Sequence, residues 1–352
     1  FGISGIGLWD NIAAYTGGTV TADGKADILA DSDTVIVNVN NNIGLAKEGT
    51  DPPAGQREPE DALSRLNEMG KGSGPHAGLN ASDIANAATG AIEGSEKAQS
   101  AWQQAKAMIK EVQDVDDAFN DWERKANPDK ETSAYAGSVN ANVSVSNVTA
   151  QIGENAVVKA GSDLNVKANV DNITVNEAGA VSANGKTGGG GAIVTDVIVN
   201  DAIASIGSNA SVDAKKNMLL DANQDYVVVQ AGVGAAVAKS TSGAGTVGVL
   251  VQTNNTKSLI GEGAKINQTY KDDKADENQT VSLNAKNKNV IVKGLGALGI
   301  QAGGQGASGK AVGGTVDTNV IVNNATAEIQ GTAANKAVVN ATKDVNLTAE
   351  NK

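Results

Sequence analysis

An internal repeat constrains the fold of this chain more than any other feature. Three Ile-Gly pairs mark it, at Ile152-Gly153, Ile206-Gly207 and Ile260-Gly261, and the interval between the first two pairs equals that between the last two. A fourth copy carries Ile329-Gln330 after a longer interval. The repeating unit is about 54 residues long, too short to bury an apolar face alone, so successive copies must stack on one another.

Within each copy, apolar and polar residues alternate with the period of a β-strand. Val139 to Val145 follow one phase of this alternation, and Val148 to Ile152 follow the other. We interpret the change of phase as a corner or bulge in the strand. Four columns of equivalent residues keep their chemistry from copy to copy: Val139, Ile193, Val247 and Val316; Val143, Val197, Val251 and Val320; Val166, Leu220, Leu283 and Leu347; Ala168, Ala222, Ala285 and Ala349. We expect these columns to stack as rungs.

The composition indicates a narrow interior. The chain of 352 residues has 42 Gly and only nine aromatic residues, 3 Trp, 4 Tyr and 2 Phe, so large side chains cannot fill a conventional core. Val, Ile and Ala would instead fill a coil a few side chains wide. The sequence therefore predicts an all-β right-handed β-solenoid, or β-helix, with each repeat forming roughly two coils. Three smaller coils per repeat, or a β-sandwich of repeated domains, are the alternatives.

One segment departs from the repeat. All five prolines, all three arginines and the single histidine lie between residues 51 and 129. Repeat registers counted from both sides place an insertion at 48–130, at a turn between strands. The predicted organisation is a degenerate first repeat (1–47), an α-helical insertion (48–130) and solenoid repeats (131–352). The repeats divide at about 131–184, 185–238, 239–304 and 305–352.

The insertion contains the candidate recognition residues. Trp102, Phe119 and Trp122 belong to an apolar stripe at helical spacing, with charged residues on the opposite face. One interpretation makes these three side chains a partner-binding surface. The other buries them against neighbouring helices or the solenoid flank.

Several chemistries find no support in the sequence. The chain has no Cys, and its one His, His76, lies in a glycine-rich loop without evident catalytic partners. Carboxylates cluster around Asp272, Asp273, Asp276 and Glu277, but no calcium-binding motif surrounds them. The net charge of −12 argues against nucleic acid or an anionic membrane as a partner, and no apolar run is long enough for a spanning helix. We predict no catalytic residue, metal or cofactor.

Three motifs carry a resemblance to a known group of proteins. These are the unit at 195–210 (TDVIVNDAIASIGSNA), the Leu-x-Ala-x-Asn strand Leu283–Asn287 and a glycine-rich link. They resemble the passenger repeats of large bacterial exoproteins, namely filamentous haemagglutinin-like adhesins and fusobacterial leukotoxin-type filamentous adhesins. The resemblance covers about 1–47 and 131–352 and brings no functional residues with it. It implies a right-handed β-helix that is exported unfolded through an outer-membrane partner and displayed on the cell surface.

The favoured function is thus a non-enzymatic segment of a secreted or surface-exposed adhesin or filament, cut from a longer protein. Its partner would be a host-cell or bacterial surface protein or glycan. Two alternatives stay open. One is a fragment of a secreted cytotoxin, in which Val227–Ala238 and Ala244–Val251 would form a membrane-inserting hairpin. The other is a polysaccharide-active β-helix enzyme, which would need clustered carboxylates or an Arg or Lys base on one face of the solenoid.

Overall fold

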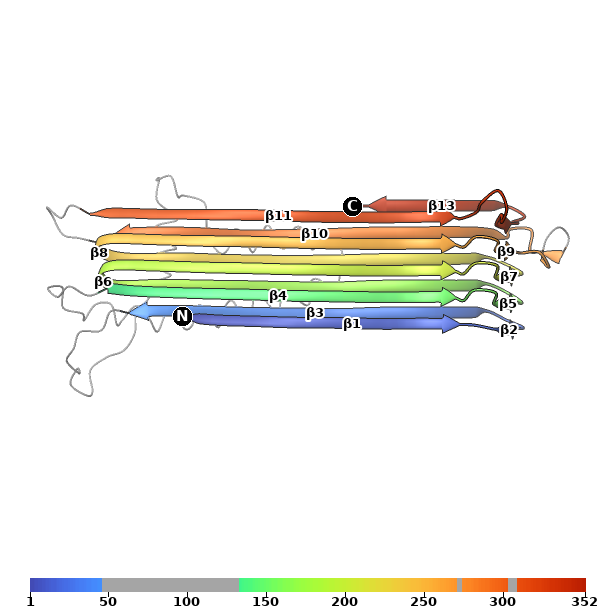
Figure 1. The fold of residues 1–352 in the computed structure, drawn as a ribbon, viewed down its shortest axis with the longest axis horizontal. Helices are drawn as coiled ribbons and strands as arrows, with labels where there is room; N and C mark the ends of the chain where they lie inside the picture. The colour runs from blue at the N-terminus through green and yellow to red at the C-terminus, as the bar shows by residue number, and fades with distance from the viewer. Residues whose placement is uncertain (46–132, 271–273, 303–308) are drawn as a thin grey trace.

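The fold was analysed in a computed structural model that describes residues 1–45, 133–270, 274–302 and 309–352. This part of the chain is all-β, with parallel sheets and no α-helix. It therefore contains no helix that is long and apolar enough to cross a membrane. The long strands run along the longest axis of the molecule, and the short strands gather at one end (Figure 1).

The strands form five stacked rungs, each with a long strand, a short strand and a returning long strand. Rung 1 contains β1 (Gly2–Thr16), β2 (Thr19–Ala22) and β3 (Ala26–Leu45). Rung 2 contains β4 (Ser133–Ile152), β5 (Val157–Ala160) and the first half of β6 (Leu164–Ile206). Rung 3 contains the second half of β6, β7 (Ser211–Ala214) and the first half of β8 (Met218–Ile260). Rung 4 contains the second half of β8, β9 (Lys265–Ile266) and β10 (Thr280–Gln301). Rung 5 contains β11 (Lys310–Ile329), β12 (Val338–Val339) and β13 (Asp344–Asn351).

Two long layers and one short sheet result from this stacking. The outbound layer consists of β1, β4, the second halves of β6 and β8, and β11. The return layer consists of β3, the first halves of β6 and β8, β10 and β13. The short strands β2, β5, β7, β9 and β12 pair in parallel at the end where the chain turns back. This arrangement is compatible with a β-solenoid.

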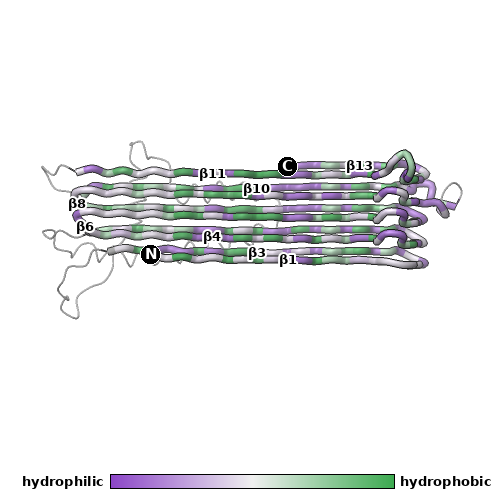
Figure 2. The backbone as a smooth tube through the Cα atoms, viewed as in Figure 1, coloured by the Kyte–Doolittle hydropathy of each residue, from purple (hydrophilic) through white to green (hydrophobic). Residues whose placement is uncertain are grey.

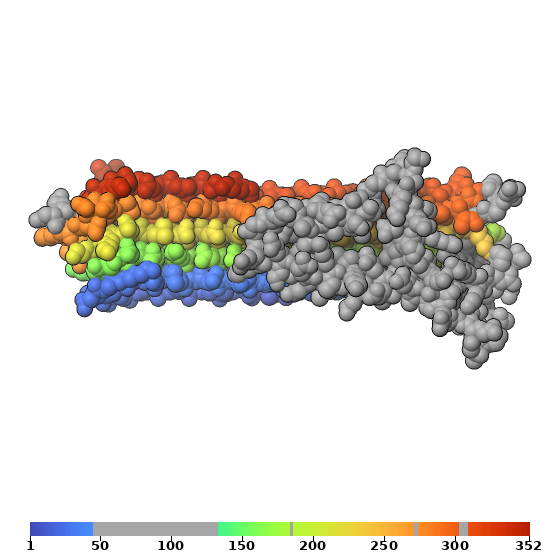
Figure 3. Space-filling model, turned by 180° about the vertical axis from the view of Figure 1, so that it is seen from behind, coloured from blue at the N-terminus to red at the C-terminus, as the bar shows by residue number. Residues whose placement is uncertain are grey.

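The pairing register shows that one repeat forms one rung. Ala141 pairs with Thr195, and Thr195 pairs with Val249, so partners lie one whole repeat apart in the sequence. The expectation of about two coils per repeat was therefore wrong. It assumed short strands, whereas the long strand β4 alone has 20 residues, and a single circuit of the rung uses the whole repeat. Figure 3 shows the rungs stacked in chain order, from blue to red.

The Ile-Gly pairs that mark the repeat begin the corners. Two residues after each glycine the backbone is left-handed, with φ of 57° at Asn155, 57° at Asn209 and 71° at Gly263. Asn and Gly tolerate this conformation better than other residues. At Gly207, a Cβ would lie only 2.6 Å from the backbone nitrogen of Glu154 in the rung before. The glycine is needed because the stacked corners approach so closely.

The interior near this corner is apolar. Two of the predicted columns lie here and are fully buried in rungs 2 to 4: Val166, Leu220 and Leu283, and Ala168, Ala222 and Ala285. They pack in one cluster with the corner isoleucines Ile152, Ile206 and Ile260. Removal of these side chains from water supplies the hydrophobic stabilisation of this end. The prediction that the columns stack is confirmed for all four by the pairing register, and these two lie in the interior.

The interior at the middle of the strands is polar in β4, contrary to expectation, whereas in rungs 3 and 4 it also buries the apolar side chains of Ile198, Val228 and Leu250. In β4 the buried side chains of this region are Ser138, Asn140, Asn142, Ser144 and Ser146. Their neighbours from Val139 to Val145 point outward and are half-buried. The other two predicted columns therefore lie on the outer surface, with Ile193 40% and Val251 36% exposed.

The predicted corner or bulge after Val145 is also absent from β4. Even-numbered residues are buried without interruption from Ser138 to Ile152, and the pairing with β6 continues through the whole strand. The apolar residues change face because the interior changes from polar to apolar while the strand stays regular. Bands of similar hydropathy recur at the same place along successive long strands (Figure 2).

At the far end of the rod the two layers come close together. A Cβ on Gly190 would overlap the carbonyl oxygen of Ala235, and a Cβ on Gly234 would overlap that of Gly245. The glycine-rich run 188–191 thus lies within β6 and lets the backbones of the two layers approach.

Leu45 and Ser133, the described residues on either side of 46–132, both lie at this far end. Leu45 pairs with Ala183 and Ser133 pairs with Thr187, so the segment joins two positions that the next rung connects through 184–186. The predicted helical insertion lies outside the described residues.

Candidate functional site: an outer apolar face over a polar interior

The outer surface of the outbound layer carries an apolar face at the middle of the strands. We call it the outer apolar face and define it by three outward columns that run through all five rungs. The columns are Ile3, Val139, Ile193, Val247 and Val316; Gly7, Val143, Val197, Val251 and Val320; and Trp9, Val145, Val199, Thr253 and Val322. A further outward column, Gly5, Ala141, Thr195, Val249 and Thr318, lies between the first two of them. β-branched residues pack well on such a pleated surface, so the face is regular as well as apolar.

The side chains of this face are available to a partner. Ile193 and Val247 in the inner rungs are 40% and 36% exposed, and Trp9 in rung 1 is 70% exposed. The face spans about 20 Å along the strands and about 19 Å across the rungs, at roughly 3.3 Å per residue and 4.8 Å per strand. Contiguous apolar patches of several hundred Å² on a soluble protein mark interaction sites.

A polar column borders the face on the side of the corners. It consists of Asn11, Asn147, Asp201, Asn255 and Asn324. Asn255 Nδ2 donates to Asp201 Oδ1 at 2.8 Å, and Asn324 Nδ2 donates to Asn255 Oδ1 at 2.9 Å. These ladder contacts fix the register of neighbouring rungs at the edge of the apolar columns.

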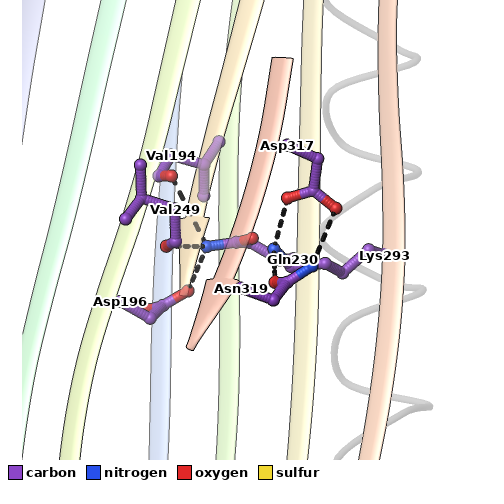
Figure 4. A network of polar contacts seen from close by, with 7 residues as sticks. All are labelled: Val194, Asp196, Gln230, Val249, Lys293, Asp317 and Asn319. Carbon is purple, nitrogen blue, oxygen red and sulfur yellow. Dashed lines mark hydrogen bonds and ion pairs between the residues drawn. The ribbon is translucent and has the colours of Figure 1, made fainter. Parts of the chain in front are cut away.

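A hydrogen-bonded network centred on Asp196 lies in the interior beneath the face, next to the buried apolar side chains of Ile198 and Leu250. Asn142 Nδ2 and Asn176 Nδ2 each donate to Asp196 Oδ1 at 3.0 Å, and Gln230 Nε2 donates to Asp196 Oδ2 at 2.8 Å. Gln230 Nε2 also lies 2.9 Å from the carbonyl oxygen of Val249 (Figure 4). Residues from both layers thus satisfy a carboxylate that is fully buried.

Burial dominates the electrostatics of this network. Loss of hydration raises the pKa of Asp196 from 3.8 to about 6, while the three amide donors and the charge of Lys293 oppose the rise. Burial likewise raises the pKa of Tyr226 well above its usual value, and its hydroxyl lies 2.6 Å from that of Thr174. The outward valines therefore cover a middle interior held by directional hydrogen bonds.

The described residues bring together no group of three or more His, Cys, Asp or Glu side chains that could hold a metal ion. The predicted partner-binding residues Trp102, Phe119 and Trp122 lie outside the described residues, as does His76. So do Asp272 and Asp273 of the acidic loop. The two segments of the hypothetical membrane hairpin, 227–238 and 244–251, lie in opposite layers and pair in parallel with their neighbours.

The outer apolar face was missed because its columns were taken as interior. One pattern in the sequence is compatible with either orientation. Asn140, Asn142, Ser144 and Ser146 alternate with the valines as regularly as the valines themselves, and Asn200 and Asn254 continue the column of Ser146. A column of amides recurring from rung to rung is typical of an interior ladder as well as of a surface.

Comparisons of the chain with protein-family models, with curated proteins and with solved structures found no match.

Proposed function

We propose that this chain is a non-enzymatic rod segment of a secreted or cell-surface bacterial adhesin or filament, built as a right-handed β-solenoid. The outer apolar face carries the proposal. Its columns keep the same position through five rungs, so the rod presents one extended contact surface rather than a pocket. The resemblance of the repeats to adhesin passenger repeats supports the same function.

The chemistry of the face favours a surface protein as the partner over a glycan. Most of its side chains are Val and Ile, which offer no hydrogen bonds, so polar groups come mainly from Trp9, Thr253 and the bordering polar column. Contact of the apolar columns with another apolar surface removes both from water, which lowers the free energy. Rigid strands also keep the entropic cost of binding low.

A binding screen on host-cell and bacterial surface proteins and on glycans tests this function. We expect the chain to bind a surface protein, and Val197→Lys to weaken that binding at least tenfold, because the substitution places a charge at the centre of the face. Asn223→Lys is the matched control, since it adds the same charge to the outer surface of the return layer. Equal binding by the two variants would show that the outer apolar face does not contact the partner.

The same protein sample tests the alternative functions. Leakage of dye from liposomes would favour a cytotoxin fragment, and cleavage of polysaccharides would favour a β-helix enzyme. The proposal predicts neither activity.

The recognition role of Trp102, Phe119 and Trp122 stays a prediction, and deletion of 48–130 tests it. We expect the deletion variant to keep its β-sheet circular dichroism, since Leu45 and Ser133 lie at a turn between rungs. If the insertion recognises the partner, the deletion lowers binding while the outer apolar face stays intact.

A further inference from the structure

Rungs 4 and 5 bring a lysine, an aspartate and an asparagine into mutual contact. Lys293 Nζ lies 2.7 Å from Asp317 Oδ1 and 2.5 Å from Asn319 Oδ1. Asn319 Nδ2 donates to Asp317 Oδ2 at 3.1 Å. The carboxylate therefore bridges the amine and the carboxamide (Figure 4).

The two layers place these three groups together. Lys293, in β10, follows Asn38, Asn176 and Gln230 in an inward column of the return layer. Asp317 and Asn319, in β11, continue inward columns of the outbound layer, above Gly248 and Leu250. The lysine thus occupies the place where the rungs below it have amides, opposite an amide and a carboxylate.

The surroundings of the three groups are uneven, since the Lys293 side chain is nearly buried whereas Asp317 and Asn319, in the last rung, are exposed. The Lys293 side chain is 12% exposed, and that of Asp317 is 35% exposed. Leu250 below Asn319 is fully buried. A Cβ on Gly248 would overlap Leu295 Cδ1 and lie 3.1 Å from Asp317 Oδ1, so a glycine there leaves the room that these side chains occupy.

We propose that Lys293 and Asn319 join in an intramolecular isopeptide bond, with Asp317 as the catalytic residue. Because a carbonyl bond is about 1.23 Å long, the Asn319 Cγ atom is at most about 3.7 Å from Lys293 Nζ, close to the separation of a near-attack arrangement. Neither a cofactor nor an oxidant is needed, because the reaction exchanges one amide for another.

The reaction balances as follows. The Lys293 ammonium gives a proton to the Asp317 carboxylate, and the neutral amine attacks Cγ of Asn319, forming the Nζ–Cγ bond. Asp317 passes protons from Nζ to the Nδ2 of Asn319, whose bond to Cγ breaks. Nδ2 leaves as ammonia, which carries the former lysine proton away as ammonium, and Asp317 returns to its carboxylate. The bond links β10 to β11 and so joins the two layers covalently.

Intact mass spectrometry of the full chain under denaturing conditions tests the proposal. The expected mass is that of the sequence minus one ammonia molecule, and digestion should release a branched peptide joining Lys293 to Asn319. Lys293→Arg keeps the charge beside Asp317 but should show the full sequence mass, as should Asn319→Ala. Asp317→Ala should slow the reaction by about 100-fold or more.

Lys288→Arg is the matched control, because Lys288 also pairs with an aspartate, Asp225, at 3.3 Å. This variant should still lose ammonia. Circular dichroism checks that every variant is folded. A wild-type chain that keeps its full mass after prolonged incubation would overturn the proposal. A loss of ammonia that persists in Lys293→Arg would also overturn it, since it would arise from another asparagine.

Discussion

The corner end and the middle of β4 use the same alternation of residues for opposite purposes. From Val148 to Ile152 the apolar residues point inward and pack in the core at the corners. From Val139 to Val145 they point outward, and serines and asparagines take the interior. Alternation of apolar and polar residues along a strand therefore shows which residues share a face. It does not show which of the two faces points to the interior, because that depends on the residues of the opposite layer.

The reason for the difference lies in what each region meets across the rod. Val148, Ala150 and Ile152 belong to the same core cluster as Leu164 and Val166 of the return layer. The middle of β4 meets Asn38, whose Nδ2 donates to Asn142 Oδ1 at 2.8 Å, and Asn172, which donates to Ser146 Oγ at 3.1 Å. Along β4, each zone of the interior is therefore matched between layers, apolar with apolar and polar with polar.

The largest effect should come from the apolar zone. Leu220→Ala removes a fully buried side chain and should lower the free energy of unfolding by about 2–5 kcal/mol. Urea unfolding followed by circular dichroism measures it. If Leu220→Ala cost no more than a surface substitution, the corner region would not be the core.

A smaller loss should come from the polar zone. Asn142→Ala removes one donor from the Asp196 carboxylate and should cost about 1–3 kcal/mol. Asn147→Ala is the control in the same strand, because Asn147 points outward and its loss should cost less than about 0.5 kcal/mol. Equal losses in the same unfolding experiment would mean that the amide network does not hold the middle of the rod.

The buried carboxylate should make stability depend on pH. The pKa of Asp196 is raised from 3.8 to about 6, so between these values the folded state binds the proton and the unfolded state does not. The chain should therefore gain about 1 kcal/mol from this group as the pH falls from about 7 to about 5.

Asp196→Asn should remove that gain. Unfolding curves of the wild type and of this variant at the two pH values give the difference directly. The same pH dependence in both proteins would show that Asp196 is solvated or lies elsewhere.

The smallest effect on stability should come from the outer apolar face. Val143→Thr keeps the β-branched shape at an outward, half-buried position, and should change the free energy of unfolding by about 0.5 kcal/mol or less. A Tm lowered as far as in Leu220→Ala would place Val143 in the core instead.

Much of the fold could be predicted from the sequence because the repeat is so regular. The constant period of the inner copies, the longer step to Ile329 and the degenerate first repeat within 1–47 all appear in the register. The number of coils per repeat could not be predicted, because alternation says nothing of strand length when no proline or turn interrupts it. Nor could the orientation of Val139 to Val145, because a Val and an Asn column stack equally well along a parallel sheet.

The outer apolar face could not be predicted from the sequence for the same reason. Its residues were found as columns, but a column is a binding surface only when it faces outward. The contact of Lys293 with Asp317 and Asn319 depends on how the two layers face each other, and a register within one layer does not fix that.

Thiol labelling tests the orientation of the middle strands most directly, since the chain has no Cys and single cysteines report without background. Val251 is 36% exposed and its neighbour Gln252 is fully buried. The account predicts that Val251→Cys reacts rapidly with a thiol reagent in the folded chain, whereas Gln252→Cys reacts only after unfolding, as does Ile260→Cys in the apolar core. Rapid labelling at 252 together with protection at 251 would show that the valines form the interior and that the outer apolar face does not exist.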